Sequence, residues 1–189
     1  MTTSSPLFPV TMPEKWQLPE QFSLSAKLLD WLSDSGSLTS RLKSLSDQFE
    51  VVVLGQQIQP CSEHEATEDI KADEQILVRE VLLKCDDKPV VFARSLIPMS
   101  SLTGDQKALA NVGNQSLGQL LFNDPALERT AFTVAEFSQS GPIISLCEHL
   151  GLQVSYPLYG RRSIFKLAGK PLSVAEIFLP DSFPYQQES

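Results

Sequence analysis

Two apolar runs of ten residues, separated by a short polar segment, place the strongest limit on how this chain of 189 residues can fold. The runs are ILVREVLLKC (76–85) and PVVFARSLIP (89–98), and Asp86, Asp87 and Lys88 lie between them. Apolar runs rich in β-branched residues and joined by a short polar turn are typical of an antiparallel hairpin. The sequence therefore predicts a fold that is built on antiparallel strand pairing.

Further strands and short helices extend this pattern. Single strands are predicted at 49–58 and 129–137, a second hairpin over 164–180, and pairs of short helices within 24–48 and 101–123. Strands that pair with near neighbours, interrupted by helices in two places, are typical of the α+β class. We expect one antiparallel sheet of about six strands with helices around it.

The chain divides into an arm, one domain and a tail. Four prolines among residues 1–19 predict an extended arm, because proline fixes φ and cannot continue a helix. Residues 20–180 are long enough to form one hydrophobic core without a disulfide or metal. Residues 181–189 are predicted to be a fraying tail. The stretch 61–74 holds six acidic residues and one lysine, which indicates a solvated loop.

Charge and composition exclude several classes of protein. The chain has 15 Lys+Arg against 23 Asp+Glu, and this formal charge of −8 argues against nucleic acid or an anionic membrane as a partner. The cysteines form no C-x-x-C motif, and no charged signal-peptide start or long apolar run occurs. We therefore expect a cytoplasmic protein without stable membrane insertion. No self-complementary apolar surface is apparent from the sequence, so a monomer is expected.

Familiar catalytic motifs are missing. The two histidines, His64 and His149, do not have the spacing of metal ligands, and Cys147 and His149 would diverge on a helix. The chain contains no G-x-S-x-G, no Walker lysine loop and no G-x-G-x-x-G. The common hydrolase and nucleotide-binding classes are therefore not indicated.

Two charged residues lie on strand faces that are otherwise apolar. Because side chains alternate along a strand, Arg79 and Glu176 each share a face with aliphatic residues, while Glu80 points to the opposite face. Burying an ionised group costs several kcal/mol unless the group is paired. Two interpretations are open: Arg79 and Glu176 form buried ion pairs, with each other or with other charges, or they line a site for an anion or hydroxyl group.

Three further arginines have two possible roles. Arg94 lies on a largely apolar strand face, and Arg161 and Arg162 lie in a stretch, 149–175, that contains no acidic residue. These side chains either add positive potential to a site or are solvated residues of edge strands.

Five motifs occur together in a fixed order over about residues 28–179, and they are R-E-x-L-L, S-x-L-x-G, L-G-x-x-L-F, G-R-R-S and G-K-P-L-x-x-x-E-x-F-L-P. In this order they resemble the bacterial chorismate lyase family. That resemblance implies the conversion of chorismate to 4-hydroxybenzoate and pyruvate, at the head of ubiquinone biosynthesis, with no metal or organic cofactor. It also implies a six-stranded antiparallel sheet and a ligand buried beneath two helical flaps, here near 34–45 and 104–122.

The resemblance also implies roles for individual residues. Arg79 matches the binding arginine of the family, Glu176 its binding glutamate, and Leu117 the leucine whose backbone N–H holds the ligand carboxylate. Leu38 stands where a methionine is expected, but its contact is made by the backbone and the change should be tolerated. Arg79 and Glu176 are then the catalytic pair, with Glu176 either a general base or only an orienting group. The segment 138–158 is longer than the usual link of the family and has no predicted role.

A non-catalytic alternative stays open. The same fold resembles the ligand-sensing domains of bacterial transcription regulators, in which a small aromatic acid would be bound but not transformed. Such regulators carry a DNA-binding domain, and residues 1–27 are too short and too poor in Lys and Arg for one. We therefore favour the lyase.

Overall fold

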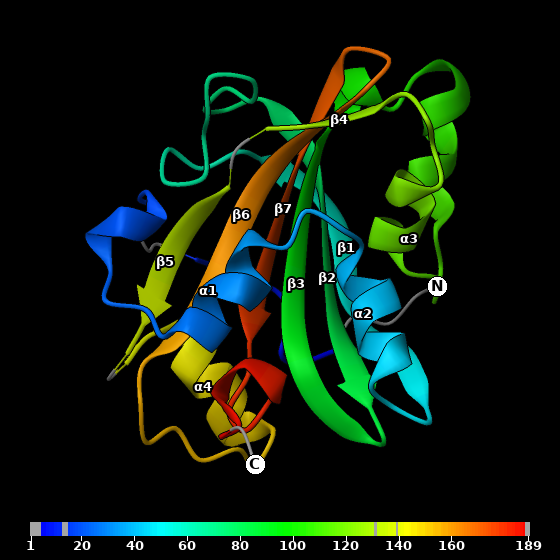
Figure 1. Ribbon diagram of the computed structural model, residues 1–189. Coiled ribbons are helices and arrows are strands. Elements are labelled where there is room, and N and C mark those ends of the chain that lie inside the picture. The colour runs from blue at the N-terminus through cyan, green and yellow to red at the C-terminus, as the bar shows by residue number, and fades with distance from the viewer. Residues whose placement is uncertain (1–4, 13–14, 131, 139, 188–189) are drawn as a thin grey trace.

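The computed structural model describes residues 5–12, 15–130, 132–138 and 140–187, so parts of the predicted arm and tail (1–4, 13–14 and 188–189) lie outside the described residues. The described chain forms one antiparallel sheet of seven strands in the order β1-β2-β3-β7-β6-β4, and β5 also pairs with β6 (Figure 1). Because β4 and β5 pair with successive parts of β6, they share one edge position. The predicted α+β class with a single antiparallel sheet is confirmed. The strands are β1 (Phe49–Pro60), β2 (Gln75–Cys85), β3 (Lys88–Pro98), β4 (Leu127–Arg129), β5 (Thr133–Phe137), β6 (Leu158–Leu167) and β7 (Lys170–Phe178).

Both predicted hairpins are present, and their turns explain the polar residues between the runs. β2 and β3 are joined at Asp86 and Asp87, whose φ values of 49° and 66° are left-handed. β6 and β7 are joined at Ala168 and Gly169, with φ of 50° and 76°. Two successive left-handed residues match the right-handed twist of the flanking strands, so both hairpins turn within two residues.

Short helices cover one face of the sheet, which we call the cavity face. Ser25, Ser37 and Ser116 cap α1, α2 and α3 by accepting a backbone N–H from the third helical residue. The predicted helix pair within 24–48 is confirmed, whereas that within 101–123 consists of a 3-10 helix followed by a short α-helix. The elements on this face are α1 (Ala26–Ser33), α2 (Leu38–Ser44), α3 (Leu117–Phe122), and the 3-10 helices η2 (Met99–Ser101), η3 (Gly104–Asn111) and η4 (Phe183–Tyr185).

The arm, an acidic loop and α4 (Pro142–His149) cover the opposite face, which we call the sealed face. In Figure 1 the dark-blue arm passes behind the strands. Val10 and Met12 of the arm are buried, and Phe8 lies so close to Gly55 that a Cβ at residue 55 would be 2.3 Å from its ring. A glycine is therefore required where the arm crosses β1. A short 3-10 helix, η1 (Pro19–Gln21), follows the arm.

Two expectations, about the acidic loop and the C-terminal tail, are wrong. The acidic loop 61–74 is not simply solvated, because Ile70 is fully buried and Glu65 is 6% exposed. The tail does not fray at Tyr185, whose hydroxyl accepts from the backbone N–H of Tyr159 at 2.9 Å and donates to the carbonyl of Phe178 at 3.0 Å. In both segments a few buried side chains hold a stretch whose overall composition is polar.

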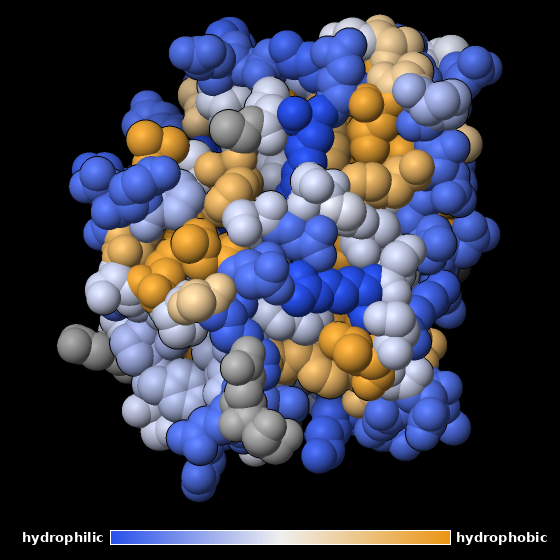
Figure 2. All heavy atoms as spheres, viewed as in Figure 1, coloured by the Kyte–Doolittle hydropathy of each residue, from blue (hydrophilic) through white to orange (hydrophobic). Residues whose placement is uncertain are grey.

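The outer surface of the covering layer is mixed in character. In Figure 2, which has the orientation of Figure 1, small orange apolar patches are separated by hydrophilic side chains. None of the helices in the described part of the chain has the length and apolar character that a membrane crossing requires.

Candidate functional site

Strand register brings the two predicted site residues to the same region of the cavity face. Arg79 of β2 lies opposite Ser95 of β3, and Ser95 lies opposite Val174 of β7, two residues before Glu176. Arg79 and Glu176 therefore project to the same side of the sheet, separated diagonally across three strands. Both line an enclosed cavity of about 30 Å³ between the sheet and the helices. Its full lining is Thr39, Val51, Arg79, Val81, Leu83, Ala93, Ser95, Ser116, Leu117, Gly118, Val174 and Glu176.

Two helical flaps close this cavity, one at α2 and one at α3. The hydroxyls of Thr39 in α2 and Ser116 at the start of α3 lie 2.6 Å apart and share a hydrogen bond. Lys43 Nζ of α2 donates to Gln119 Oε1 of α3 at 3.3 Å. An outer groove of about 480 Å³ shares Val51 and Ser116 with the cavity. The cavity and the groove are therefore neighbours at the junction of the two flaps.

The closed cavity is smaller than any organic ligand of interest. Ligand pockets commonly have volumes of roughly 300–1,000 Å³, whereas about 30 Å³ is enough only for water. A ligand of the size of an aromatic acid must therefore separate the flaps from the sheet to enter. The helices that form the flaps have only seven and six residues and are joined to each other by side-chain hydrogen bonds.

Arg79 is a buried cation without a carboxylate partner among the described residues. Its side chain is 3% exposed, and Nη2 donates to the carbonyl oxygen of Gln115 at 3.0 Å. Burial lowers the pKa of this guanidinium, because desolvation disfavours the charged form. An anion in the cavity would supply the missing negative charge.

Glu176 is paired, but not with Arg79. Its Oε2 accepts a hydrogen bond from Nε of Arg161 at 2.7 Å, and the two residues face each other across β6 and β7. Arg161 is 2% exposed, so the interpretation of this arginine as a solvated edge residue is wrong. The alternative in which Arg79 and Glu176 neutralise each other is also not what the structure shows.

The two leucines differ in their positions. Leu117 opens α3 and lines the cavity, and its backbone N–H belongs to the first helical turn, where no intrahelical acceptor exists. Leu38 opens α2, but its buried side chain packs among residues of α1, and it is the next residue, Thr39, that lines the cavity. The structure thus brings Arg79, Glu176 and Leu117 together in the cavity lining. Leu38 is not part of this lining but immediately precedes Thr39, which is.

The polar residues of the flaps were not predicted from the sequence. Thr39 and Ser116 supply hydroxyl groups to the cavity lining, and Ser95 supplies a third from β3. The dipeptide Ser-Leu begins both flaps but occurs seven times in the chain, so it could not have indicated them.

The sealed face holds a second set of buried charges. Arg94 is 1% exposed and donates to both oxygens of Glu65, at 2.7 and 2.9 Å, and to Glu80 at 3.0 Å. The backbone N–H of Val10 donates to both oxygens of Glu80, at 2.6 and 3.0 Å. Desolvation nevertheless raises the pKa of Glu80 to about 7. Arg94 is therefore not a solvated edge residue. Arg162 on this face is half-buried, and its guanidinium lies 5.2 Å from the centroid of the Trp16 ring.

These features define a class: an α+β domain with a small, largely apolar cavity that carries a few polar and charged groups, between an antiparallel sheet and two short helices. Solved structures share the fold at low sequence identity. The C-terminal domain of the histidine utilization repressor from Pseudomonas syringae pv. tomato matches with a TM-score of 0.56 at 13% identity, covering 75% of this chain and 97% of that domain. PhnF from Mycobacterium smegmatis matches with a TM-score of 0.61 at 12% identity, over 79% of this chain and 66% of that one. These likenesses show the fold alone.

Sequence relatives identify the family. The probable chorismate pyruvate-lyase of Psychromonas ingrahamii is 46% identical over 161 residues, which are 85% of this chain and 87% of that protein. The probable chorismate pyruvate-lyase of Idiomarina loihiensis is 40% identical over 185 residues, which are 96% of this chain and 95% of that protein. The sequence model of the chorismate lyase family matches residues 12–189. The chain belongs to the chorismate lyase family, as the motifs predicted.

Proposed function

We propose that this protein is a chorismate pyruvate-lyase, which converts chorismate to 4-hydroxybenzoate and pyruvate. Membership of the family supports the proposal. The structural observation that carries it is the enclosed cavity, in which Arg79 has no carboxylate partner and Glu176 lies on the same side of the sheet. An anionic ligand with a hydroxyl group suits these two side chains.

The chemistry explains why so few functional groups are needed. Chorismate loses the proton at C4, and the bond between C3 and the enolpyruvyl oxygen breaks with its electron pair on the departing oxygen. The ring becomes aromatic, and the released enolpyruvate takes up a proton on its methylene carbon to become pyruvate. Aromatisation supplies the driving force, so the protein has to hold the ring and neutralise charge on the leaving oxygen. No metal or organic cofactor is needed for these steps.

Four residues have roles in this proposal. Arg79 donates to the ether oxygen as negative charge grows on it, because its guanidinium is buried and faces the cavity. Glu176 holds the C4 hydroxyl with the oxygen that Arg161 does not occupy, and it is placed to receive the C4 proton. The backbone N–H groups of Leu38 and Leu117, at the starts of the two flap helices, hold the ring carboxylate.

The test is to mix the purified protein with chorismate and to quantify both products against a protein-free control. Equimolar 4-hydroxybenzoate and pyruvate, formed faster than in the control, are the expected result. No acceleration combined with saturable binding of 4-hydroxybenzoate would instead support the non-catalytic, sensor-like alternative.

Glu176→Gln separates the two roles that the carboxylate could have. If Glu176 is the general base, kcat should fall about 10²–10⁴-fold while substrate binding is retained, because an amide cannot accept the proton. Near-normal turnover would show that the proton passes directly to the enolpyruvyl group and that Glu176 only orients the ring. Single-turnover kinetics and the KM for chorismate distinguish these outcomes.

The remaining parts of the proposal concern the setting of the reaction. We propose that it supplies 4-hydroxybenzoate for ubiquinone biosynthesis, in the cytoplasm, and that the protein acts as a monomer. Light scattering during size-exclusion chromatography tests the last point, since a dimer would elute at about twice the mass of 20.9 kDa.

A further inference from the structure

Arg161 of β6 lies between Glu176 and the end of α1, and it has no proposed contact with substrate. Its Nε donates to Glu176, as described, at 2.7 Å. Its Nη1 donates to the carbonyl oxygens of Trp31, Leu32 and Asp34, at 3.3, 3.2 and 2.7 Å. One buried guanidinium thus connects the candidate catalytic carboxylate with the end of α1.

These carbonyl groups belong to the end of α1 and to the link that leads into the α2 flap. The last carbonyl groups of a helix have no intrahelical donor and carry its partial negative charge. A guanidinium donates hydrogen bonds to these carbonyl groups and offsets their negative charge. The carbonyl oxygen of Asp34 also accepts from Nη1 of Arg129 at 3.0 Å, and Arg129 Nε donates to Ser163 at 3.1 Å. Two arginines of the sheet therefore anchor the link before α2.

The ion pair with Glu176 also decides which charge a ligand meets in the cavity. Without Arg161, Glu176 would be a largely buried anion with Arg79 as the other charged side chain in the lining. It would repel an anionic ligand, or draw the guanidinium of Arg79 towards itself. With Arg161 in place, Glu176 is neutralised from the β6 side and the charge of Arg79 is left for the ligand.

We propose that Arg161 is a positioning residue of this site. It orients Glu176, offsets the charge of that carboxylate so that Arg79 can bind an anion, and ties both to the link that carries the α2 flap. The inference rests on the proposed function, because it takes the ligand to be chorismate or its product.

A double-mutant cycle tests the charge-offsetting role without relying on turnover. The affinity for 4-hydroxybenzoate is measured by titration calorimetry for the native protein, Arg161→Met, Glu176→Gln and the double variant. Arg161→Met should weaken binding by about tenfold or more, because it leaves Glu176 unpaired beside the ligand. The double variant should bind more tightly than Arg161→Met alone, because a neutral amide needs no counter-charge. A residue that only held the α1 carbonyl groups would give additive effects.

Two further variants keep the result interpretable. Arg94→Met removes an equally buried, ion-paired arginine from the sealed face, so it should lower stability but leave the affinity within about twofold. Arg161→Gln replaces Arg161→Met in the cycle if the latter does not fold. Its neutral amide leaves Glu176 without a counter-charge. Binding should therefore still be weakened, and Glu176→Gln should still relieve the loss.

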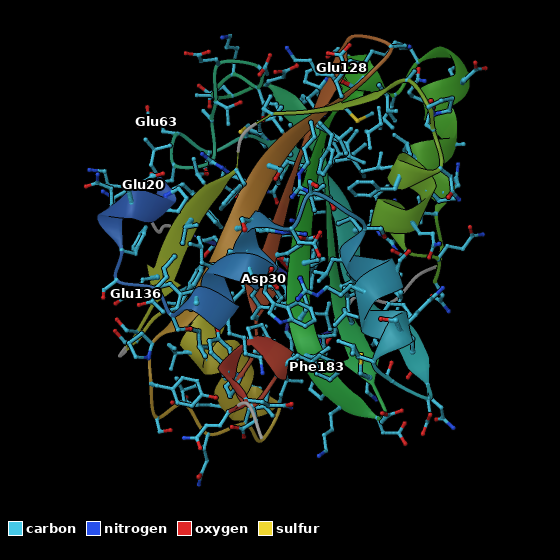
Figure 3. The ribbon with its side chains drawn as sticks, in the orientation of Figure 1. Glu20, Asp30, Glu63, Glu128, Glu136 and Phe183 are labelled. Atoms are coloured by element: carbon cyan, nitrogen blue, oxygen red, sulfur yellow. The ribbon has the colours of Figure 1, made fainter. Side chains whose placement is uncertain are left out.

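Trp31 reports on the connection to the flap. The guanidinium of Arg41 in α2 lies 3.7 Å from the centroid of the Trp31 ring. The ring of Phe183 in η4 stacks on Trp31 with a centroid distance of 5.7 Å. Figure 3 shows Phe183 beside α1, which also carries Asp30. The chain has two tryptophans, so Trp16→Phe leaves Trp31 as the single emitter. 4-Hydroxybenzoate should change its fluorescence in this background, and Arg161→Lys should reduce the change by at least about half at saturating ligand.

The possible outcomes separate the two proposals. A non-additive cycle, with Arg94→Met unaffected in binding, supports the role of Arg161. An additive cycle, or an Arg161→Lys variant with a full fluorescence response, overturns that role while the lyase proposal stands. A native protein that binds neither chorismate nor 4-hydroxybenzoate overturns both.

Discussion

Arg79 and Glu80 are neighbours in the sequence, yet they face opposite sides of the sheet and very different surroundings. On the sealed face, Glu80 lies in a network with Arg94, Glu65 and the N–H of Val10, whose contacts are 2.6–3.0 Å long. On the cavity face, Arg79 donates to a single carbonyl group and borders an unfilled space. Buried charge by itself does not distinguish a site from a structural ion pair. A buried charge that is incompletely paired and borders a cavity does distinguish a site.

The same contrast recurs along the neighbouring strands. Arg94 precedes Ser95 of the cavity lining, and Arg161, which serves the cavity face, precedes Arg162 of the sealed face. Strand alternation sends each pair to opposite sides. A sheet that is covered on both faces can therefore keep a buried ionic network directly behind a candidate ligand site.

Removing Arg94 should have the largest effect on stability. Arg94→Met leaves two buried carboxylates, Glu65 and Glu80, without their cation, and we expect a loss of about 3–5 kcal/mol in the free energy of unfolding. Activity of the folded fraction should stay within about threefold, because Arg94 does not line the cavity. Urea denaturation and the product assay measure the two quantities. A large loss of kcat/KM at unchanged stability would contradict the distinction between the two faces.

Removing Arg79 should lower activity strongly and stability little, the reverse of removing Arg94. Arg79→Met should lower kcat/KM by about 10²–10³-fold, because no other group would neutralise the leaving oxygen. The free energy of unfolding should change by less than about 1 kcal/mol, since a buried cation without a carboxylate partner adds little stability. Arg79→Lys is the matched control, and it should recover part of the rate because it keeps the charge but not the fork. Loss of stability without loss of activity would show that Arg79 is a structural residue.

These expectations show which parts of the molecule could be predicted from the sequence. The hairpins and the inward direction of Arg79 and Glu176 followed from strand alternation, which depends only on local order along the chain. The partners of Arg79 and Glu176 did not follow, because pairing across β6 and β7 depends on register, and the acceptor of Arg79, Gln115, lies in a loop. The resemblance supplied Leu38 and Leu117, which carry no chemical signal of their own.

The sealed network was beyond prediction for a related reason. Glu65 belongs to an acidic loop in which nothing distinguishes it from its exposed neighbours, and Val10 belongs to a proline-rich arm. Both come to Arg94 or Glu80 only through tertiary packing, across 29 and 70 residues of sequence. Composition describes only the average character of a segment. Here the contact of a single residue, Glu65 in the loop or Val10 in the arm, holds the segment against the sheet.

The titration of Glu80 on the sealed face should make the stability of the protein depend on pH. The pKa of Glu80 is raised from 4.5 to about 7, because desolvation outweighs its contacts with Arg94 and Val10 while Glu65 adds a like charge. The folded protein therefore binds the proton more strongly than the unfolded chain does. Between pH 4.5 and about 7, the free energy of unfolding should fall as pH rises, by about 1–3 kcal/mol. Glu80→Gln should flatten this slope in urea denaturation, and a slope that persists unchanged would assign the titration to another group.

The smallest expected effect concerns how each face is closed. The arm is held over the sealed face by a carboxylate and by buried Val10 and Met12, whereas a hydroxyl pair, Thr39 with Ser116, joins the two flaps over the cavity. Thr39→Val removes the Thr39 hydroxyl but keeps the shape of the side chain. A buried hydrogen bond contributes about 0.5–1.5 kcal/mol, so product release should become about 2- to 10-fold faster.

Thr39 is the better target of the hydroxyl pair, because Ser116 also caps α3 by accepting from Gln119 N–H. If flap opening limits turnover, the native protein should show a pre-steady-state burst of 4-hydroxybenzoate, and Thr39→Val should reduce the burst while raising the steady rate. Ser101→Ala is the matched control, since it removes a 2.7 Å hydroxyl contact to the carbonyl of Pro171 away from the flap junction. Equal acceleration by Ser101→Ala would mean that general loosening of the covering layer, and not the contact between the flaps, controls release.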